Sequence, residues 1–183
     1  RVFETSPYRR PWSPKGSTTR QIPPLRSPVP LVAIAPDPDA IATAAAWIAD
    51  AKHPILIAQR GAGSAATFDA FAAWADSHAI AVSSWWATHL ALATDHPSHI
   101  GSEPGVAMAE ADVVIVLDCL APWWPDRHKL RPDARVIHIG PDPLFSRTPT
   151  RGFRCDLAIA GETDATLTRL MKAVDGAAPA PHS

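Results

Sequence analysis

The sequence predicts an α/β protein, a three-layer, Rossmann-like, doubly wound domain with a mainly parallel sheet of about five or six strands. Short uninterrupted apolar runs, such as ILIA at 55–58 and VVIVL at 113–117, alternate with longer segments of helical periodicity. Such runs are typical of strands that are covered on both faces, as they are in a parallel sheet. With 183 residues, of which 46% are hydrophobic, the chain can build one full core, but two would be thin.

Residues 1–35 are predicted to be a proline-rich, basic, extended connector with little core of its own. The first 30 residues contain seven prolines and six Lys or Arg residues against a single acidic residue, Glu4. They show neither helical nor alternating periodicity, which is typical of an extended linker. The domain proper is expected over 36–176, followed by a tail over 177–183. Because the sequence begins at Arg1 and not at methionine, we expect it to be a piece of a longer polypeptide.

The first half of the domain predicts two helices and two strands. Asp37 can cap a helix whose first turn holds Pro38, and an alanine-rich run continues this helix to Lys52. A strand follows at 55–58. The other two expected elements are a helix over 64–78 and a strand over 80–83.

The second half continues the alternation. The expected elements are a helix at 104–111, strands at 113–117, 136–139 and 157–160, and a final helix at 162–174. Strands that alternate with helices indicate a parallel sheet. Ligands of such sheets collect at the carboxyl ends of the strands, so we sought candidate sites there.

The strongest local signal for a ligand is the turn after the strand at 55–58. Gly61, Gly63 and Ser64 lie between that strand and the next helix, where backbone N–H groups and the helix dipole can receive a phosphate. A tight turn that needs glycine only for its geometry explains the pattern equally well. An NAD site also requires an acidic residue about 20 positions later. No Asp or Glu occurs from 77 to 94, which argues against an ordinary NAD dehydrogenase.

Two other strands also end at polar or glycine-containing positions. Gly140 and Asp142 follow the strand at 136–139, so a carboxylate at 142 could accept hydrogen bonds from a ribose while Gly140 admits an adenine. Asp118 follows the strand at 113–117. We interpret it as a helix cap or turn residue, the usual role of aspartate at a strand end.

Aromatic and histidine pairs have simpler explanations than ligand binding. The tryptophan pairs at 85–86 and 123–124 are expected to dock against a neighbouring domain or subunit, because large aromatic side chains are enriched at such contacts. His96 and His99 flank Pro97, which interrupts any helix, and no further ligand is apparent. We therefore expect a loop there and no metal site.

Composition excludes several classes of protein. A net charge of −1 gives no reason to expect nucleic acid or a membrane surface as a partner, and no apolar run has the length of a membrane span. Cys119 and Cys155 form no Cys-x-x-Cys pair, which argues against a zinc site or a secreted disulfide framework and favours the cytoplasm. The Gly-x-Ser-x-Gly motif of serine hydrolases is absent.

Several segments, in order, carry a resemblance to a known family. They are AAWIADAKHPILIAQRGAGSAATFDAFAAWADSHAIAVSSWWATHLALATDHPSHIGS, ADVVIVLDCLAPWWP, ARVIHIGPDPLFSR and DLAIAGETDATLTRL. Together they resemble the central domain of thiamine-diphosphate-dependent enzymes, in particular the acetolactate synthase and benzoylformate decarboxylase group. The resemblance implies a six-stranded parallel sheet. In some members this domain holds FAD or an adenine nucleotide, and in others it only braces the dimer or tetramer.

The resemblance also transfers to individual residues. Gly61 and Gly63 match the glycine turn of the family, and Gly140 with Asp142 matches its Ile-Asp-x-Asp strand end, with glycine in place of the first aspartate. The stretch around Asp118 lacks the Gly-x-Arg/Phe run of the flavin-binding synthases.

The catalytic residues of the family are not found in this chain. The family uses a glutamate of an N-terminal domain, and a Gly-Asp-Gly segment followed by asparagine in a C-terminal domain to hold magnesium and diphosphate. This chain has no asparagine, and its four glutamates stand in other contexts. We therefore expect no catalytic and no metal-binding residue here.

The resemblance implies a role for the chain within a larger protein. It would be a non-catalytic scaffold, with thiamine diphosphate and magnesium held by the N- and C-terminal catalytic domains of a homo-oligomeric parent protein. The parent would act on 2-oxo acids by carboligation or decarboxylation. The alternative is a stand-alone nucleotide-binding or regulatory module for FAD, ADP or a CoA-type ligand.

Overall fold

The structure, a computed structural model, describes residues 34–148 and 151–177. The predicted connector over 1–35 and the tail therefore lie almost wholly outside the described residues. The elements are α1 (Pro38–Ala49), β1 (Pro54–Ala58), α2 (Ala65–Ser77), β2 (Ala81–Ser83), α3 (Gly105–Glu110), β3 (Val113–Leu117), β4 (Arg135–Gly140), β5 (Leu157–Ala160) and α4 (Thr163–Ala177). Every element expected from the sequence is present, with ends that differ by a few residues.

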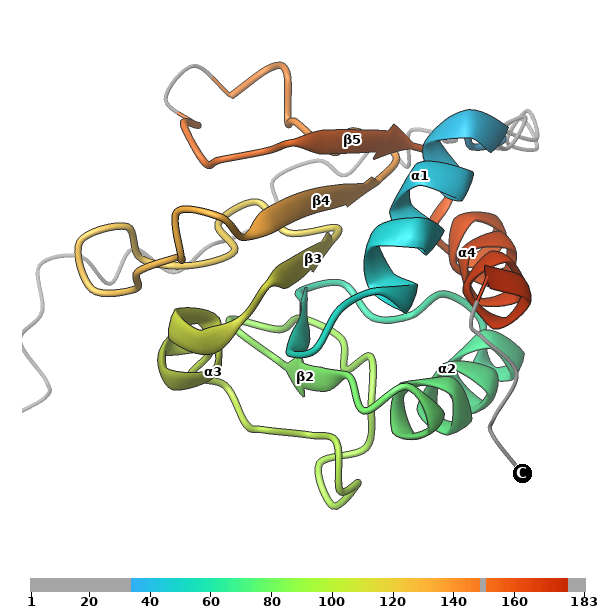
Figure 1. The fold of residues 1–183 in the computed structure, drawn as a ribbon, viewed down its shortest axis with the longest axis horizontal. Coiled ribbons are helices and arrows are strands. Elements are labelled where there is room, and N and C mark those ends of the chain that lie inside the picture. The colour runs from blue at the N-terminus through green and yellow to red at the C-terminus, as the bar shows by residue number, and fades with distance from the viewer. Residues whose placement is uncertain (1–33, 149–150, 178–183) are drawn as a thin grey trace, which may run out of the picture. The chain divides into compact units, whose positions relative to one another are not determined.

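One parallel sheet organises the described part of the chain (Figure 1). Its five strands run in the order β2-β1-β3-β4-β5, and every neighbouring pair is parallel. After β2 the chain crosses to the opposite side of β1, so the direction of winding changes between β1 and β3. This arrangement confirms the predicted three-layer, doubly wound, Rossmann-like fold.

A sixth strand, implied by the family resemblance, is reduced here to a single parallel bridge between Val82 and His99. Val82 donates to the carbonyl of Ser98 at 2.8 Å and accepts from the amide of Ile100 at 2.9 Å. The amides that would extend the ladder are bound elsewhere: that of Ser98 donates to Nδ1 of His96, and that of Ile80 donates to the carbonyl of Ala75. Beyond the bridge, Gly101 turns the chain with φ +85°. The sheet among the described residues therefore has five strands and the start of a sixth.

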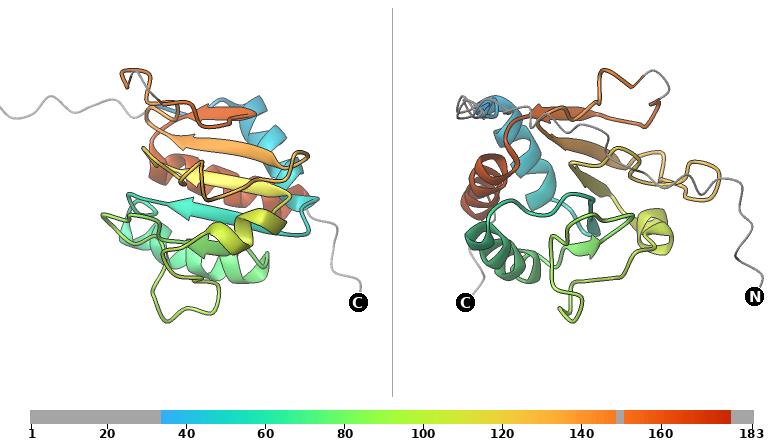
Figure 2. Two further views of the ribbon diagram at one scale, coloured as in Figure 1. Left: turned by 90° about the vertical axis from the view of Figure 1, so that its left-hand side faces the viewer. Right: turned by 180° about the vertical axis from the view of Figure 1, so that it is seen from behind.

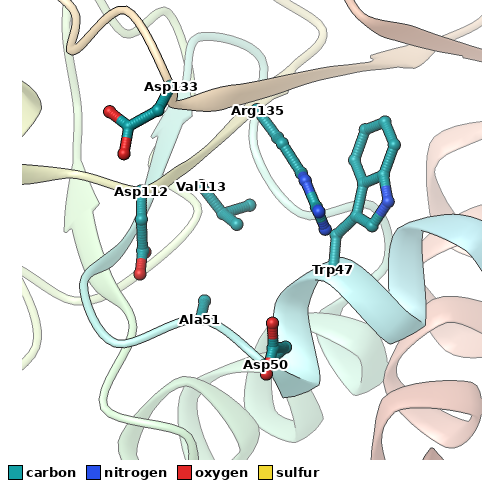
Figure 3. A pocket seen from close by; sticks show the side chains of 7 residues that line it. All are labelled: Trp47, Asp50, Ala51, Asp112, Val113, Asp133 and Arg135. Carbon is teal, nitrogen blue, oxygen red and sulfur yellow. The ribbon is translucent and has the colours of Figure 1, made fainter.

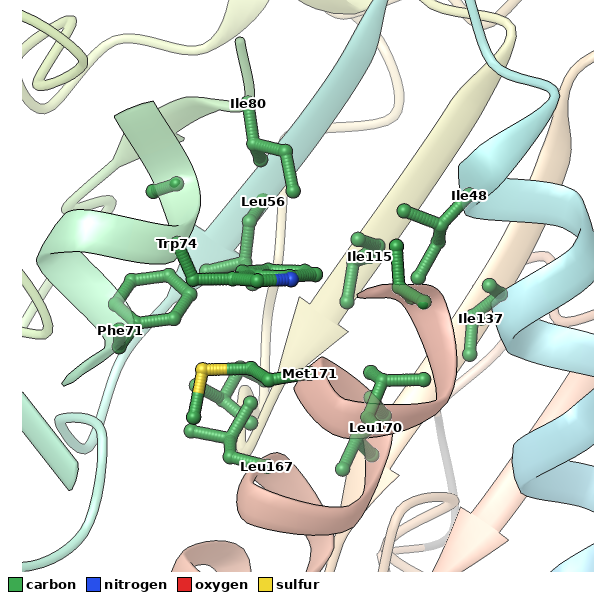
Figure 4. Packing of buried hydrophobic residues seen from close by; sticks show 14 of the residues in the cluster. Ile48, Leu56, Phe71, Trp74, Ile80, Ile115, Ile137, Leu167, Leu170 and Met171 are labelled. Atoms are coloured by element: carbon green, nitrogen blue, oxygen red, sulfur yellow. The ribbon is translucent and has the colours of Figure 1, made fainter. Parts of the chain in front are cut away.

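Two helical layers cover the two faces of the sheet (Figures 1 and 2). α1, α2 and α4 lie together on one face, where the larger hydrophobic cluster includes Leu56, Ile115 and Phe71 (Figure 4). α3 and the loop over 119–134 cover the other face, against Val114 and Val116. Alternate residues of each central strand enter opposite clusters, so these strands are apolar throughout.

The ends of α1 show how local and distant hydrogen bonds set a helix boundary. As predicted, Asp37 caps the helix and Pro38 lies in its first turn. The prediction that the helix continues to Lys52 is wrong. The amides of Lys52 and His53 donate instead to the carboxylate of Asp112, at 2.7 and 3.0 Å. Desolvation raises the pKa of Asp112, but these hydrogen bonds outweigh it, and the pKa lies below its usual value.

The core of α2 offers a matched pair of substitutions. Phe71 is fully buried, whereas Phe68 on the same helix is half-buried. We expect Phe71→Ala to lower the free energy of unfolding by about 3–5 kcal/mol, because it removes buried surface and leaves a cavity. Phe68→Ala is expected to cost about 1 kcal/mol. Urea denaturation followed by tryptophan fluorescence measures both, and equal losses would contradict the packing of α2 described here.

Candidate functional site at the carboxyl edge of the sheet

The polar residues predicted as ligand-binding groups gather at the carboxyl edge of the sheet. This edge is formed by residues 59–64 after β1, 118–120 after β3 and 141–146 after β4. In a doubly wound sheet the crevice between the strands where the winding reverses, here β1 and β3, is the usual ligand site. The contacts at this edge therefore decide what the domain can bind.

The glycine turn is built around two residues with positive φ. Gly61 has φ +83° and Gly63 has φ +95°, values that residues with a side chain rarely adopt. A Cβ on Gly61 would lie 3.3 Å from the Cβ of His89, and a Cβ on Gly63 would lie 2.6 Å from Oδ1 of Asp164. Both glycines are thus required by the turn itself and by protein segments that pack against it.

Asp164, in the first turn of α4, places a carboxylate at the N-terminus of α2. Its Oδ1 accepts a hydrogen bond from the backbone N–H of Ser64 at 2.7 Å. Ser64 is the N-cap of α2, and its Oγ accepts from the amide of Thr67. Hydrogen bonds from the Thr67 side chain and from Ser64 hold the pKa of Asp164 below its ordinary value. A carboxylate of the chain itself therefore occupies the position that favours an anion.

The crevice between β1 and β3 is closed by direct contacts. Nη1 of Arg60 donates to Oδ1 and to the carbonyl oxygen of Asp118, both at 3.0 Å. The side chain of Gln59 accepts from the amide of Leu120 at 2.8 Å. As interpreted, Asp118 is a turn residue, with φ +44° directly after β3, but its carboxylate does not cap a helix and forms an ion pair with Arg60 across the crevice. The parallel register of β1 with β3 brings these two residues together.

Gly140 and Asp142, the second predicted pair, face different surroundings. A Cβ on Gly140 would lie 3.4 Å from the Cα of Asp118, so this glycine adjoins the crevice. Both carboxylate oxygens of Asp142 accept from the amide of Ser146, each at 3.1 Å. Asp142 is exposed and stabilises its own turn. The structure therefore groups Gly61, Gly63 and Ser64 in one turn and directs Asp142 to another.

Arg151, which the sequence analysis did not single out, ties the loops at this edge together. It donates to the carbonyls of Cys119 and Leu120 at 3.1 and 3.0 Å. Its guanidinium lies over the ring of Phe145, 5.1 Å from the centroid, and that of Arg60 lies 5.2 Å from the same centroid. Both arginines are thus engaged with protein groups.

His138 is the buried partner of Arg151. Its Nδ1 lies 3.0 Å from Nη2 of Arg151, and its Nε2 lies 3.0 Å from the carbonyl oxygen of Arg154. Because the guanidinium only donates, Nδ1 is the acceptor and Nε2 carries the proton. Burial, followed by the charge of Arg151, lowers the pKa of His138 to about 4. His138 is therefore a neutral structural residue near pH 7.

A cavity of about 500 Å³ lies beside the glycine turn. It is lined by Arg60, Gly61, Ala62, Gly63, Ser64, Ala65, Phe68, Asp69, His89 and Leu90. Within the described ranges 34–148 and 151–177, no group of three or more His, Cys, Asp or Glu side chains is placed to hold a metal ion. No helix of this part of the chain is long and apolar enough to cross a membrane.

Comparison with known protein families identifies the domain. Residues 41–170, from α1 to α4, match the family described as thiamine pyrophosphate enzyme, central domain. The chain belongs to this family. A search of curated proteins gives no match for this central domain.

Two solved structures share the fold of the central domain over part of their own length. One, described as a thiamin diphosphate-dependent enzyme from Mycobacterium smegmatis, is 24% identical, with a TM-score of 0.65 over 86% of this chain and 31% of that chain. Another, benzoylformate decarboxylase from Polynucleobacter necessarius, is 20% identical, with a TM-score of 0.60 over 82% of this chain and 30% of that chain. At these identities the similarity establishes the fold. The chain spans about a third of the length of either protein.

In each tryptophan pair of the central domain, one side chain is more buried than the other. Trp123 is buried against the ring of Phe153, while Trp124 is 48% exposed. Trp85 is half-buried and stacks on Trp86, which is 61% exposed. One member of each pair thus belongs to the fold, and the other is available to a neighbour.

His96 and His99 lie in a loop, as predicted, and bind different groups. Nδ1 of His96 accepts from the amide of Ser98 at 3.2 Å. Nε2 of His99 lies 2.9 Å from Oγ of Ser84, which follows β2. These contacts fix the loop against the edge of the sheet.

A second pocket lies at the opposite, amino edge of the sheet (Figure 3). The guanidinium of Arg135 covers the ring of Trp47 at 5.1 Å from its centroid. Asp133 pairs with Arg131, and Asp112 holds the chain between α1 and β1. Three of the four charged side chains that line this pocket, those of Asp112, Asp133 and Arg135, therefore already have protein partners.

Asp164 gives the central domain a pH-dependent component of stability. We expect Asp164→Asn to lower the free energy of unfolding at pH 7 by about 1 kcal/mol, because a charged acceptor at a helix N-terminus is lost. The folded-state pKa is depressed, so the wild-type advantage is full above the unfolded value near 4 and disappears as the pH falls through the folded value. Urea denaturation at pH 7 and at pH 3 measures the difference.

Asp69→Asn provides the control, because Asp69 is an exposed carboxylate in α2, the helix whose N-terminus Asp164 contacts. A difference between wild type and Asp164→Asn that persists unchanged at pH 3 would argue against a role for the charge.

Proposed function

We propose that this chain is the non-catalytic scaffold domain of a thiamine-diphosphate-dependent enzyme that carboligates or decarboxylates a 2-oxo acid. The observation that carries the proposal is the family match over residues 41–170, which spans the sheet and its helices. The similarity in fold to benzoylformate decarboxylase supports a 2-oxo acid as substrate and supports the acetolactate synthase and benzoylformate decarboxylase group.

The cofactor is assigned to other parts of the parent protein. In such an enzyme thiamine diphosphate would supply a nucleophilic ring carbon and an electron sink for a 2-oxo acid, and magnesium would hold its diphosphate. The described residues do not fit thiamine diphosphate and its magnesium ion. They contain no cluster of metal ligands, and Arg60, which could otherwise bind a diphosphate, is paired with Asp118. We assign thiamine diphosphate and magnesium to N- and C-terminal catalytic domains, and no step of the reaction to this chain.

A second candidate function rests on the cavity beside the glycine turn. Its volume of about 500 Å³ and its lining by Gly61, Gly63 and Ser64 favour FAD, ADP or a CoA-type ligand, bound either within the parent enzyme or by a stand-alone regulatory module. This candidate differs from the first in requiring measurable affinity of the chain itself for a nucleotide.

Activity assays distinguish the chain from its parent. We expect the purified 183-residue chain to turn over neither pyruvate nor benzoylformate when thiamine diphosphate and magnesium are supplied. The full-length protein isolated from its source cells is expected to turn over a 2-oxo acid, with activity lost on removal of thiamine diphosphate. Turnover by the chain alone, or a full-length protein indifferent to thiamine diphosphate, would overturn the proposal.

The exposed tryptophans support a homo-oligomer in which neighbouring subunits or domains cover them. A chain of contacts connects Trp86 and Trp124: Trp86 stacks on Trp85, Trp85 packs edge-on against His128, and Nδ1 of His128 accepts from the amide of Trp124. Exposed aromatic side chains of this kind are enriched at protein interfaces. Both cysteines are free thiols, which supports a reducing compartment such as the cytoplasm.

Substitution of these tryptophans tests the interface. We expect Trp86→Ser with Trp124→Ser to shift the full-length protein toward smaller species in analytical ultracentrifugation, because buried aromatic contacts between subunits are lost. Leu144→Ser is the control, since Leu144 is also 48% exposed but lies in the turn after β4. An unchanged sedimentation profile for the double variant would count against this interface.

A further inference from the structure

We infer that Asp164 is an internal substitute for a ligand phosphate and that it closes the glycine turn of this domain to anionic ligands. The inference rests on the proposed scaffold function and deepens it, because it names the residue that keeps anionic ligands out of this turn. Three observations carry it: the hydrogen bond to the turn, the close approach of Asp164 to Gly63, and the charges around the adjoining cavity.

The first observation concerns the donor that a phosphate would need. The N–H of Ser64 points from the N-terminus of α2 and is bound to Oδ1 of Asp164 at 2.7 Å. A carboxylate oxygen at a helix N-terminus satisfies the same N–H group, and the same helix dipole, as a phosphate oxygen would. A phosphate could bind there only after displacing Asp164, and it would carry negative charge toward that carboxylate.

The second observation is the distance between Asp164 and the turn. A Cβ on Gly63 would lie 2.6 Å from Oδ1 and 3.0 Å from the Cα of Asp164. The backbone of α4 itself is therefore in contact with the turn. In a phosphate-binding loop glycine allows a ligand to approach the backbone, whereas here it allows the first turn of α4 to do so.

The third observation concerns the charges around the cavity beside the turn, where the available space does not prevent binding. The cavity beside the turn has about 500 Å³ and could contain part of a nucleotide. The charged side chains that line the cavity are Arg60 and Asp69, beside the imidazole of His89, and Asp164 lies against the turn. Arg60, the one arginine among them, donates to Asp118. A phosphate would thus meet two carboxylates, an imidazole and an arginine that is already paired.

Calorimetry with ADP and with inorganic phosphate tests the inference on the 183-residue chain. We expect the wild type to show no binding at millimolar ligand, and Asp164→Ala to bind at least tenfold more tightly than the wild-type limit. Asp69→Ala removes a carboxylate from the same cavity without freeing the N–H of Ser64, and is expected to behave like the wild type. Binding of ADP by the wild type, or a folded Asp164→Ala variant that gains no affinity, overturns the inference.

A second measurement needs no variant and decides the matter if Asp164→Ala does not fold. In ¹H–¹⁵N spectra of the wild type, the amide of Ser64 is expected to shift as Asp164 is protonated and to stay unchanged when ADP is added at pH 7. A shift of this amide on addition of ADP would refute the assignment. Neither experiment reads thiamine-dependent turnover, so failure here leaves the assignment of the parent enzyme to be judged by its own assay.

Discussion

A parallel sheet brings the carboxyl ends of all its strands to one edge, and every polar group that follows a strand must find a partner there. In many doubly wound proteins a ligand supplies part of those partners. Here the chain supplies the contacts itself: Asp164 binds the N-terminus of α2, Arg60 pairs with Asp118, and Arg151 joins the loops after β3 and β4. This edge is thus held by internal contacts, which agrees with the proposed scaffold function.

The elements of the fold were predictable because their signals are local. The apolar runs of β1 and β3 and the cap at Asp37 each depend on a few consecutive residues. The contacts that decide the site are not local: Asp164 is 100 positions from Ser64, and Asp118 is 58 positions from Arg60. Periodicity and turn chemistry carry no information about such pairs. The end of α1 was mispredicted for the same reason, since Asp112, about 60 positions away, accepts from the amides of Lys52 and His53, which follow the helix.

The glycine turn illustrates why a motif alone leaves function open. The sequence Gly61-Ala62-Gly63-Ser64 is compatible with a phosphate loop and with a tight turn, and the family match does not distinguish between them. The two differ in what approaches the backbone of Gly63, a ligand or another segment of protein. That question is answered by the packing of α4, which the local sequence around the turn cannot report.

The contact between Gly63 and Asp164 has a consequence for how this family can change over evolutionary time. A side chain at position 63 would collide with Asp164, so the two positions are expected to vary together and not independently. A lineage that acquires a nucleotide at this turn would lose the carboxylate at 164 and keep the glycine. A lineage that abandons the turn altogether would be free to lose both. The residue that accompanies the glycine, more than the glycine itself, would then mark which central domains carry a ligand.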